Sequence, residues 1–531
     1  MPDPQPPAQP IPEDPAPART APPAPDSSEP DPTEPAAARA AAAAAPPVHA
    51  FRPGGTWLLG VVLAVLTFWL FAQSLLNVIP TIRESLGMSA AVGDLAVSLT
   101  ALFAGIFVVV AGGIGDRIGQ TVVFRVGIAL SILGALLLVL TPAHQGALTA
   151  ALFLGGRAVL GLSTACIMPS ALSLISTFFE GPERQRAVSM FSLGTFGGLG
   201  VASLAGGLIA GALGWRTIFL ISIAASLLAY WWTRRTPWIR PEPSTAARRR
   251  FDWAGLAVFF VALVGLNVYI SQGRTLGWTS AAGLGLLALT ALAFAAFVAL
   301  SLRRGADAFI DLRMFSNLRF TGPVVANFPM NSTAAIIIVS LGLMQAAAGW
   351  SPLQAGLLTI GHLVCVIAAI RIGEKLLQRL GPKRPMLWGT LSGMVGLLLA
   401  ACTFLPLPAY APVTALGLAL FGLGQGLFAT PAIDATITSV PRDGVGAASG
   451  ILKMGSTLGQ AIGVSAATAL SALGRESAPA SIAGWAPTGW LEGTDPERFG
   501  AMLGAGLLGV IAVAMVLSVL VLVPRSGAPK A

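Results

Sequence analysis

From about residue 56 onward, the chain consists of long apolar stretches separated by short polar gaps. Most stretches exceed about eighteen residues, which is enough for a helix to cross the hydrocarbon core of a bilayer. The pattern predicts fourteen membrane-spanning helices. They are expected at about 56–80, 90–111, 122–141, 148–176, 187–213, 217–233, 253–272, 280–302, 321–347, 353–375, 385–405, 413–437, 445–472 and 500–523.

The composition excludes a water-soluble globular protein. Only 10% of the 531 residues are charged, 55% are hydrophobic, and the mean hydropathy is +0.77. A chain that crosses a bilayer must satisfy its backbone hydrogen bonds internally, and repeated helices do so. We therefore expect an all-α, multi-pass membrane protein.

Residues 1–50 differ from the rest, because they are rich in Pro, Ala and acidic side chains and show no apolar periodicity. This composition is typical of a disordered tail, which we expect in the cytoplasm. The Ala-rich run Ala36–Ala45 could be read as part of a signal peptide. It follows acidic residues and lacks a basic start, so we assign it to the tail.

The net charge of +9 alone would suggest a nucleic-acid partner, so its distribution is decisive. With Asp116 placed inside, most Lys and Arg residues fall in cytoplasmic gaps and in the C-terminal tail. This is the positive-inside pattern of membrane proteins. We expect both termini in the cytoplasm, contact with membrane lipid, and no nucleic-acid partner.

The residues that could carry enzymatic chemistry are scattered. Cys166, Cys365 and Cys402 lie within apolar spans, and the three His residues are far apart in the sequence. We find no metal-ligand spacing, disulfide framework, phosphate-binding loop or His/Cys/Asp constellation. The chain is therefore expected to be neither an enzyme nor a cofactor-binding protein.

The gap Gly112–Gly119 reads GGIGDRIG and separates two apolar segments. Asp116 and Arg117 cannot remain unpaired in hydrocarbon, and the glycines permit close helix approach. We expect a tight turn at the membrane surface.

Two landmarks suggest an internal duplication. Asp116 has a degenerate counterpart in Gln378, and Pro169 corresponds to Pro431, each pair being 262 residues apart. Transporter folds often contain such repeats. The predicted organisation is a tail at 1–50, a six-helix bundle at 56–233, two inserted helices at 253–302 and a second six-helix bundle at 321–523.

Arg157 lies in the middle of the fourth span. A guanidinium group near a span end could reach outward to the membrane surface. Charges within a membrane more often line a pathway, and we favour a functional role.

Two embedded carboxylates are candidates for proton binding. Asp434 follows Pro431 by three residues in the inner part of the twelfth span, and Asp94 lies about one turn into the second span. Desolvation beside a water-filled cavity disfavours a charged carboxylate, so such a group can take up and release a proton. Asp434 is the first candidate and Asp94 the second. The alternatives are a helix-capping role for Asp434 and an interfacial charge for Asp94.

The first span carries aromatic and amide side chains of the kind expected in a pocket for flat, drug-sized molecules. These are Phe68, Phe71, Gln73 and Asn77. The rings could equally face lipid. The two amides lie one helical turn apart, and two amides are not expected to face lipid together.

Further polar residues lie in later spans. Asn327 and Asn331 in the ninth span share a helix face and are candidate substrate contacts. Arg371 and Glu374 are spaced for a local ion pair, and Lys453 is expected to extend toward the inner surface.

The GGIGDRIG gap resembles the loop between the second and third helices of the major facilitator superfamily. Gly112, Asp116, Arg117 and Gly119 match, whereas Gln120 and Thr121 replace a usual basic pair. The resemblance implies that Asp116 and Arg117 form a charge-relay latch between helix bundles on the cytoplasmic side, weakened by that replacement.

Two more stretches extend the resemblance. Arg157 and Gly161 match an R-x-x-x-G element whose arginine is implicated in proton transfer. The segment GGLIAGALGWRTIF is similar to the antiporter motif of drug exporters, although Ser203 occupies the usual proline position.

The whole region from Thr56 to Pro524 is similar to the fourteen-span drug:proton antiporter branch, and to its Nor-type quinolone-efflux pumps. TFWLFAQSLLNVIP, RQRAVS and ATPAIDATIT are among the similar stretches. Many relatives carry an aspartate in the first span where this chain has Ala72. Coupling must then use another carboxylate, or no proton.

The resemblance implies proton-driven export of amphipathic drugs or biocides, quinolones among them, by a monomer in a bacterial cytoplasmic membrane. Two bundles would rock about a cavity among spans one, two, four, nine and twelve. The alternative is export of an endogenous metabolite or a self-made antibiotic by the same fold.

Overall fold

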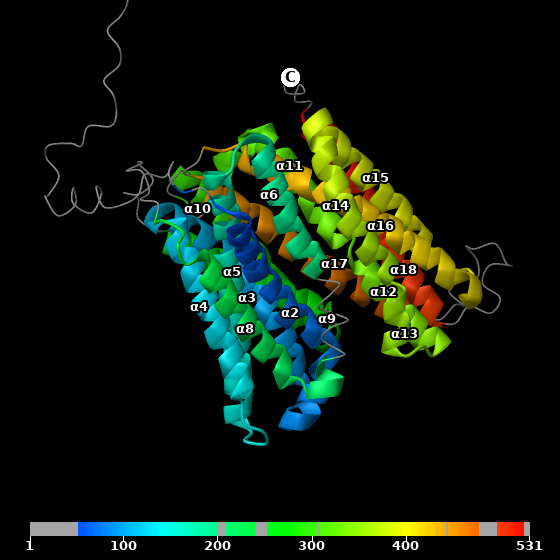
Figure 1. Ribbon diagram of the computed structural model, residues 1–531. Coiled ribbons are helices and arrows are strands. Elements are labelled where there is room, and N and C mark those ends of the chain that lie inside the picture. Colours follow the sequence, from blue (N-terminus) through cyan, green and yellow to red (C-terminus); the bar gives the residue numbers. More distant parts are fainter. Residues whose placement is uncertain are drawn as a thin grey trace, which may run out of the picture. The chain divides into compact units, whose positions relative to one another are not determined.

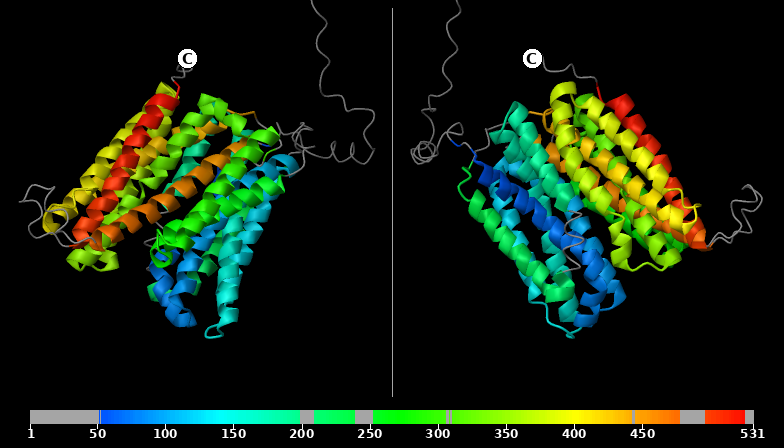
Figure 2. Two further views of the ribbon diagram at one scale, coloured as in Figure 1. Left: turned by 180° about the vertical axis from the view of Figure 1, so that it is seen from behind. Right: turned by 45° about the vertical axis from the view of Figure 1, so that its right-hand side comes forward.

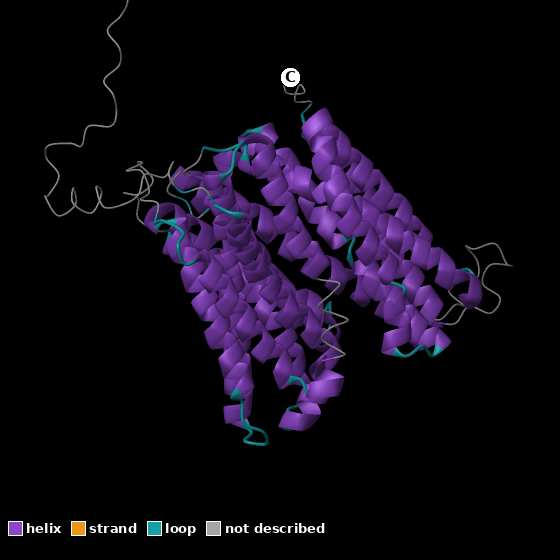
Figure 3. Cartoon of the chain, in the orientation of Figure 1, coloured by secondary structure: helices purple, strands orange, loops and turns teal. Residues whose placement is uncertain are grey.

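A computed structural model describes residues 51, 53–198, 209–238, 252–305, 308, 310–441, 444–476 and 496–524. The predicted tail at 1–50 lies outside this part of the chain. Within the described residues every regular element is a helix (Figure 3). The prediction of an all-α protein is confirmed.

The first half of the chain forms the helices that pack around the first apolar core (Figure 1). They are α2 (Gly55–Leu86), α3 (Ala90–Ile118), α4 (Gln120–Val139), α5 (Ala147–Phe178), α6 (Gly181–Ser192), the π-helical turn η2 (Leu193–Gly197) and α8 (Arg216–Thr233). Helix α5 packs against both α3 and α4, and α8 packs against α2 and α4. Trp57, Phe124, Phe153 and Phe219 are buried in this core.

Two helices follow, α9 (Trp253–Leu276) and α10 (Ala281–Arg304), which pack against each other. Asp252 precedes α9, accepts a hydrogen bond from the Gly255 amide and pairs with Arg304 of α10. Phe259 and Phe297 belong to a separate apolar cluster that also contains Ile106 of α3. Helices α9 and α10 therefore pack against each other, and their apolar side chains share a cluster with α3.

The second half begins with a short 3-10 turn, η4 (Leu312–Ser316), and forms a second bundle. Its helices are α11 (Leu318–Ser332), α12 (Ala335–Ala348), α13 (Pro352–Leu357), α14 (Ile360–Leu380), α15 (Lys383–Ala400), α16 (Leu407–Ile437), α17 (Val445–Glu476) and α18 (Pro496–Leu522). The views in Figure 2 agree that α12–α16 and α18 lie together, apart from α2–α5. Glycine permits the closest contacts: a Cβ added at Gly396 would lie 2.4 Å from the Gly417 carbonyl oxygen.

The fourteen expected spans all overlap helical segments of the described residues. Nine helical segments in this part are long and apolar enough to cross a membrane, if α11 with α12 and α13 with α14 are each counted as one segment. Large apolar side chains such as Leu140, Val510 and Val521 are 65–74% exposed, as expected where lipid covers the surface.

The ninth and tenth spans are each divided into two helices, α11 with α12 and α13 with α14. The first break follows Pro329, Asn331 and Ser332, which are poor helix formers. The Thr333 hydroxyl donates to the Met330 carbonyl, which offers the backbone an alternative to continued α-helix.

Pro169 and Pro431, the second pair of duplication landmarks, both lie inside long helices, α5 and α16. In sequence order, α5 contains the fourth expected span of the first bundle and α16 contains the fourth expected span of the second.

The expected turn at Gly112–Gly119 is shorter than predicted. Helix α3 continues to Ile118, and only Gly119, with φ of 105°, separates it from α4. Asp116 does not end the helix, because its carboxylate accepts hydrogen bonds from backbone amides of α17.

Candidate functional site

A cavity lies between the two bundles, with about 540 Å³ of empty space including its open mouth. Its walls come from α5, α6 and η2 of the first bundle and from α11, α16 and α17 of the second. Met168, Phe191 and Phe428 contribute apolar surface. The fourth, ninth and twelfth spans (α5, α11 and α16) therefore line the cavity as expected. The fifth span (α6 and η2) and the thirteenth (α17) also line it.

Asn327 and Asn331, both predicted substrate contacts, lie on the cavity wall. The Asn327 amide donates to the Leu452 carbonyl at 2.9 Å and to Ser456 Oγ at 2.7 Å. The Asn331 amide donates to Asn327 Oδ1 at 3.0 Å. The prediction that the two share a face is confirmed, and the bonds of Asn327 attach α11 to α17.

Lys453 also lines the cavity, rather than extending toward the inner surface as expected. Helix α17 packs against both α3 and α11, so the position that looked peripheral in the sequence faces the interior between the bundles.

Gln425 lines the cavity and is only 4% exposed, although it is not among the predicted site residues. Its Oε1 atom has no hydrogen-bond partner among the described residues. An amide between two glycines in the apolar stretch GLGQGLF is the signal that could have found it.

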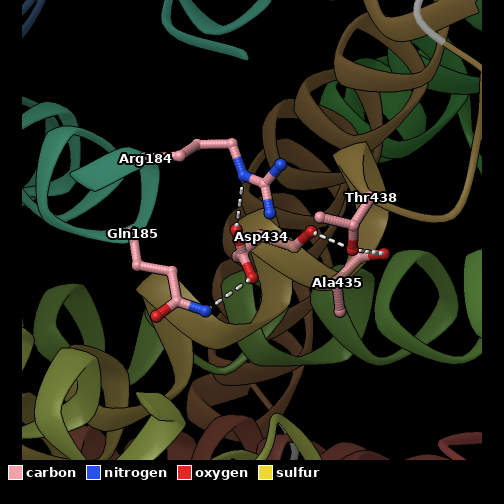
Figure 4. Close-up of polar contacts among 5 residues, drawn as sticks. All are labelled: Arg184, Gln185, Asp434, Ala435 and Thr438. Carbon is pink, nitrogen blue, oxygen red and sulfur yellow. Dashed lines mark hydrogen bonds and ion pairs between the residues drawn. The ribbon is translucent and has the colours of Figure 1, made fainter. Parts of the chain in front are cut away.

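Asp434 lies in the last turn of α16, next to the cavity-lining residue Ile433, and connects the two bundles (Figure 4). Its Oδ1 atom accepts from Arg184 Nε at 3.2 Å, and its Oδ2 atom accepts from Gln185 Nε2 at 3.4 Å. Both donors belong to α6 of the first bundle. The Asp434 side chain is 8% exposed and that of Arg184 is 20% exposed, so water screens this pair only in part.

Asp116 makes a second connection between the bundles. Its carboxylate accepts from the amides of Gly446 at 3.1 Å and Ala447 at 2.9 Å, in the first turn of α17. A helix N-terminus favours a negative charge, since its amides point outward and carry partial positive charge.

Gln120, which replaces a basic residue of the usual family pattern, supports this connection. Its amide donates to Asp116 Oδ1 at 2.6 Å and to the Gly112 carbonyl at 3.3 Å. Arg117 lies in the same last turn of α3 and is partly exposed.

The backbones of α3 and α17 touch beside this connection. A Cβ added at Gly112 would lie 2.3 Å from the Gly446 carbonyl oxygen, and one added at Gly450 would lie 2.9 Å from the Val108 carbonyl oxygen.

Arg371 and Glu374 form the predicted local ion pair, with 2.9 Å between Nη1 and Oε2. Arg371 also contacts the sulfur of Met190, which brings α14 of the second bundle to α6 of the first. These contacts and those of Asp116 and Asp434 all gather at one end of the bundles, where α3 and α16 end and α6 and α17 begin.

Arg157 is 1% exposed inside the first bundle. Its Nε donates to the Ala96 carbonyl at 2.9 Å, and Thr100 Oγ1 donates to the Arg157 carbonyl at 2.9 Å. The alternative of a side chain reaching the membrane surface does not fit this burial. Its role in proton transfer stays a prediction.

Phe68 is 9% exposed and belongs to the apolar core of the first bundle. The side chains of Phe71, Gln73, Asn77 and Asp94 lie outside the described part of the structure, as does Ser203 of the antiporter-like segment.

Comparisons with known proteins agree with this architecture. The family model of the Major Facilitator Superfamily matches residues 57–318 and 323–530. The chain is 43% identical over 428 residues to the Quinolone resistance protein NorB of Staphylococcus aureus strains MSSA476 and Newman, covering 81% of this chain and 90% of each relative.

Two solved structures share the fold at low sequence identity. The proton:xylose symporter XylE aligns with a TM-score of 0.59 and 15% identity, covering 89% of this chain and 96% of its own. The human organic anion transporter MFSD10 (TETRAN) aligns with a TM-score of 0.56 and 14% identity, covering 89% of this chain and all of its own.

These matches confirm several predictions together. The protein is an all-α, multi-pass membrane transporter with the major facilitator fold, rather than an enzyme. The chain belongs to the major facilitator superfamily.

Proposed function

We propose that this protein exports amphipathic drugs and biocides, quinolones among them, across a bacterial cytoplasmic membrane, in exchange for protons. The observation that carries the proposal is a cavity with apolar and amide walls, built from both bundles, together with contacts of Asp434 and Asp116 that connect the bundles. The similarity to proteins named for quinolone resistance supports the substrate class.

Transport would proceed by alternating access. In the arrangement described here, contacts of Asp434 and Asp116 hold the inner ends of the bundles together. Breaking them would let the bundles rock and open the cavity toward the cytoplasm, where a drug enters. Re-forming them would close the inner side, and the drug would leave outward.

Asp434 is the proposed proton site. A proton on its carboxylate removes the negative charge that attracts Arg184, and so weakens the contact between α6 and α16. Protonation then favours the inward-open state, and deprotonation favours inner closure. If drug binding favours inner closure, protons move inward while drug moves outward.

The other candidate residues keep supporting roles in this proposal. Asp94 is the alternative proton site, Arg157 assists proton transfer, and Asp116 and Arg117 form the second inner latch. The proposed substrate contacts are Gln73, Asn77, Phe68, Phe71, Asn327 and Asn331.

The proposal also includes the organisation of the chain. It has a cytoplasmic tail at 1–50, bundles at 56–233 and 321–523, and inserted helices at 253–302. It works as a monomer in contact with lipid, with both termini in the cytoplasm.

The test is efflux of norfloxacin and ethidium from proteoliposomes with an imposed pH gradient. Wild type, Asp434→Asn and Glu183→Gln are compared. Glu183 is an exposed acid in α6, next to Arg184, and serves as the control. We expect gradient-driven efflux in wild type and in Glu183→Gln, and its loss in Asp434→Asn.

Efflux that persists in Asp434→Asn would move the proton site to Asp94 or Asp116. If wild type moves neither compound, the endogenous-metabolite alternative replaces drug export.

A further inference from the structure

The segment 234–238 follows the end of α8 and lies against the junction between α3 and α4. Its backbone carbonyls accept hydrogen bonds from α4. Thr121 Oγ1 donates to the Pro237 carbonyl at 3.0 Å, and Arg125 Nη2 donates to two further carbonyls of the segment at 2.9 Å. These bonds attach the segment to the first two turns of α4.

The same segment also contacts α3 and α2. Trp238 Nε1 donates at 3.1 Å to the carbonyl of Ile118, the last residue of α3. The last carbonyls of a helix have no partner within that helix, so this bond satisfies one of them. Trp57 Nε1 of α2 donates to Thr236 Oγ1 at 2.7 Å in a buried contact. The segment is therefore bonded to α2 and to both helices of the junction.

The junction itself is a single glycine. Gly119 has a φ of 105°, a conformation that suits glycine, and it separates the end of α3 from the start of α4. One glycine between two helices puts little restraint on the angle between them. Because the segment 234–238 is bonded on both sides of Gly119, it opposes a change in that angle.

This angle determines where the Asp116 carboxylate points. Asp116 lies in the last turn of α3, and Gln120 at the start of α4 donates to its Oδ1 atom at 2.6 Å, across the junction. The same carboxylate accepts from the amides of Gly446 and Ala447 in α17. A different angle at Gly119 would move Gln120 away from Asp116 and turn the carboxylate relative to α17.

We propose that Thr121 and Trp238 are positioning residues for the contact of Asp116 with α17, acting through the segment 234–238. They hold α3 and α4 at the angle that directs the carboxylate to the α17 amides. The inference rests on the proposed function, since it concerns one of the contacts that close the inner side. Both residues belong to the first bundle, so they affect the contact between the bundles through Asp116.

The test measures the ratio of inward-open to inner-closed molecules in full-length protein, from distances between spin labels at Glu183 and Thr438. The test variant combines Thr121→Val with Trp238→Phe. Each substitution removes one hydrogen-bond donor and keeps a side chain of similar shape.

The control is Trp231→Phe, the same exchange at a residue of α8 that is 58% exposed and contacts Arg234 through its ring face. We expect the test variant to raise the ratio by about three- to tenfold, less than the direct loss of two hydrogen bonds would give. Trp231→Phe should leave the ratio within about twofold.

Two further backgrounds separate positioning from a general loosening of the first bundle. In Asp116→Ala the contact with α17 is already missing, so the test substitutions should have no further effect. In Arg184→Gln the other inner contact is missing and their effect should be kept in full. Equal shifts in the two backgrounds would overturn the inference.

A lowered unfolding temperature of the test variant with an unchanged ratio would also overturn the inference, because the two residues would then contribute to stability alone. The label distances need no substrate, so failure of the export proposal is distinguished separately. A protein that moves neither norfloxacin nor ethidium in proteoliposomes can still show the expected dependence on Asp116.

Discussion

Arg184 and Asp434 are 250 residues apart in the sequence, yet Arg184 Nε lies 3.2 Å from the Asp434 carboxylate. The pair joins α6 of the first bundle to α16 of the second. Two opposite charges that meet only in one conformation act as a latch for that conformation.

Loss of the arginine charge should release this latch. Arg184→Gln is expected to shift the population of inner-closed molecules toward the inward-open state by about tenfold or more, since a charged hydrogen bond is lost. Distances between spin labels at Glu183 and Thr438, on the two sides of the latch, would report the shift. Arg184→Lys keeps the charge and is the matched control; the same opening in both variants would contradict the charge-based explanation.

Protonation of Asp434 should have the same effect as removal of its partner. Lowering the pH is expected to lengthen the distance between the two labels in wild type, because the neutral carboxyl group no longer attracts Arg184. In Asp434→Asn the long distance should be present at every pH. A pH response of normal size in Asp434→Asn would place the responding proton elsewhere.

The contact between α3 and α17 allows a steric test with a neighbouring control. Gly112→Ala places a Cβ about 2.3 Å from the Gly446 carbonyl oxygen, so the two backbones must separate. Gly113→Ala meets no atom within 4 Å. We expect drug efflux to fall several-fold in the first variant and to stay near wild type in the second. Equal activity of the two variants would show that this contact does not limit transport.

The two asparagines on the cavity wall should differ in their contribution to stability. Asn327→Ala removes the bonds to Leu452 and Ser456 and also deprives Asn331 of its side-chain partner. Asn331→Ala leaves the bonds between α11 and α17 intact. With roughly 1–3 kcal/mol for each buried group left unsatisfied, Asn327→Ala should lower the apparent unfolding temperature in detergent more than Asn331→Ala. The reverse order would contradict the structural role of Asn327.

The spanning helices could be predicted from sequence because hydrophobic length is a local property, and the same holds for the ion pair of Arg371 with Glu374. Arg184 was not predicted as a partner of Asp434, because pairing across the two bundles has no local signature. Lys453 was misplaced for the same reason: helical position alone does not say which neighbour covers each face. The turn at Gly112–Gly119 was predicted too long, since the partners that stabilise Asp116 come from α17.

The backbone contact of Gly112 with Gly446, and of Gly450 with Val108, has a consequence for how fast the bundles can move. Large interlocking side chains would have to leave their rotamers before two helices could roll over each other. Where glycines bring the backbones of α3 and α17 into contact, few side chains interlock. The two helices can then rotate against each other with little rearrangement of side chains. The pace of the cycle would then be governed by polar contacts such as that of Arg184 with Asp434, and these can be controlled by a proton.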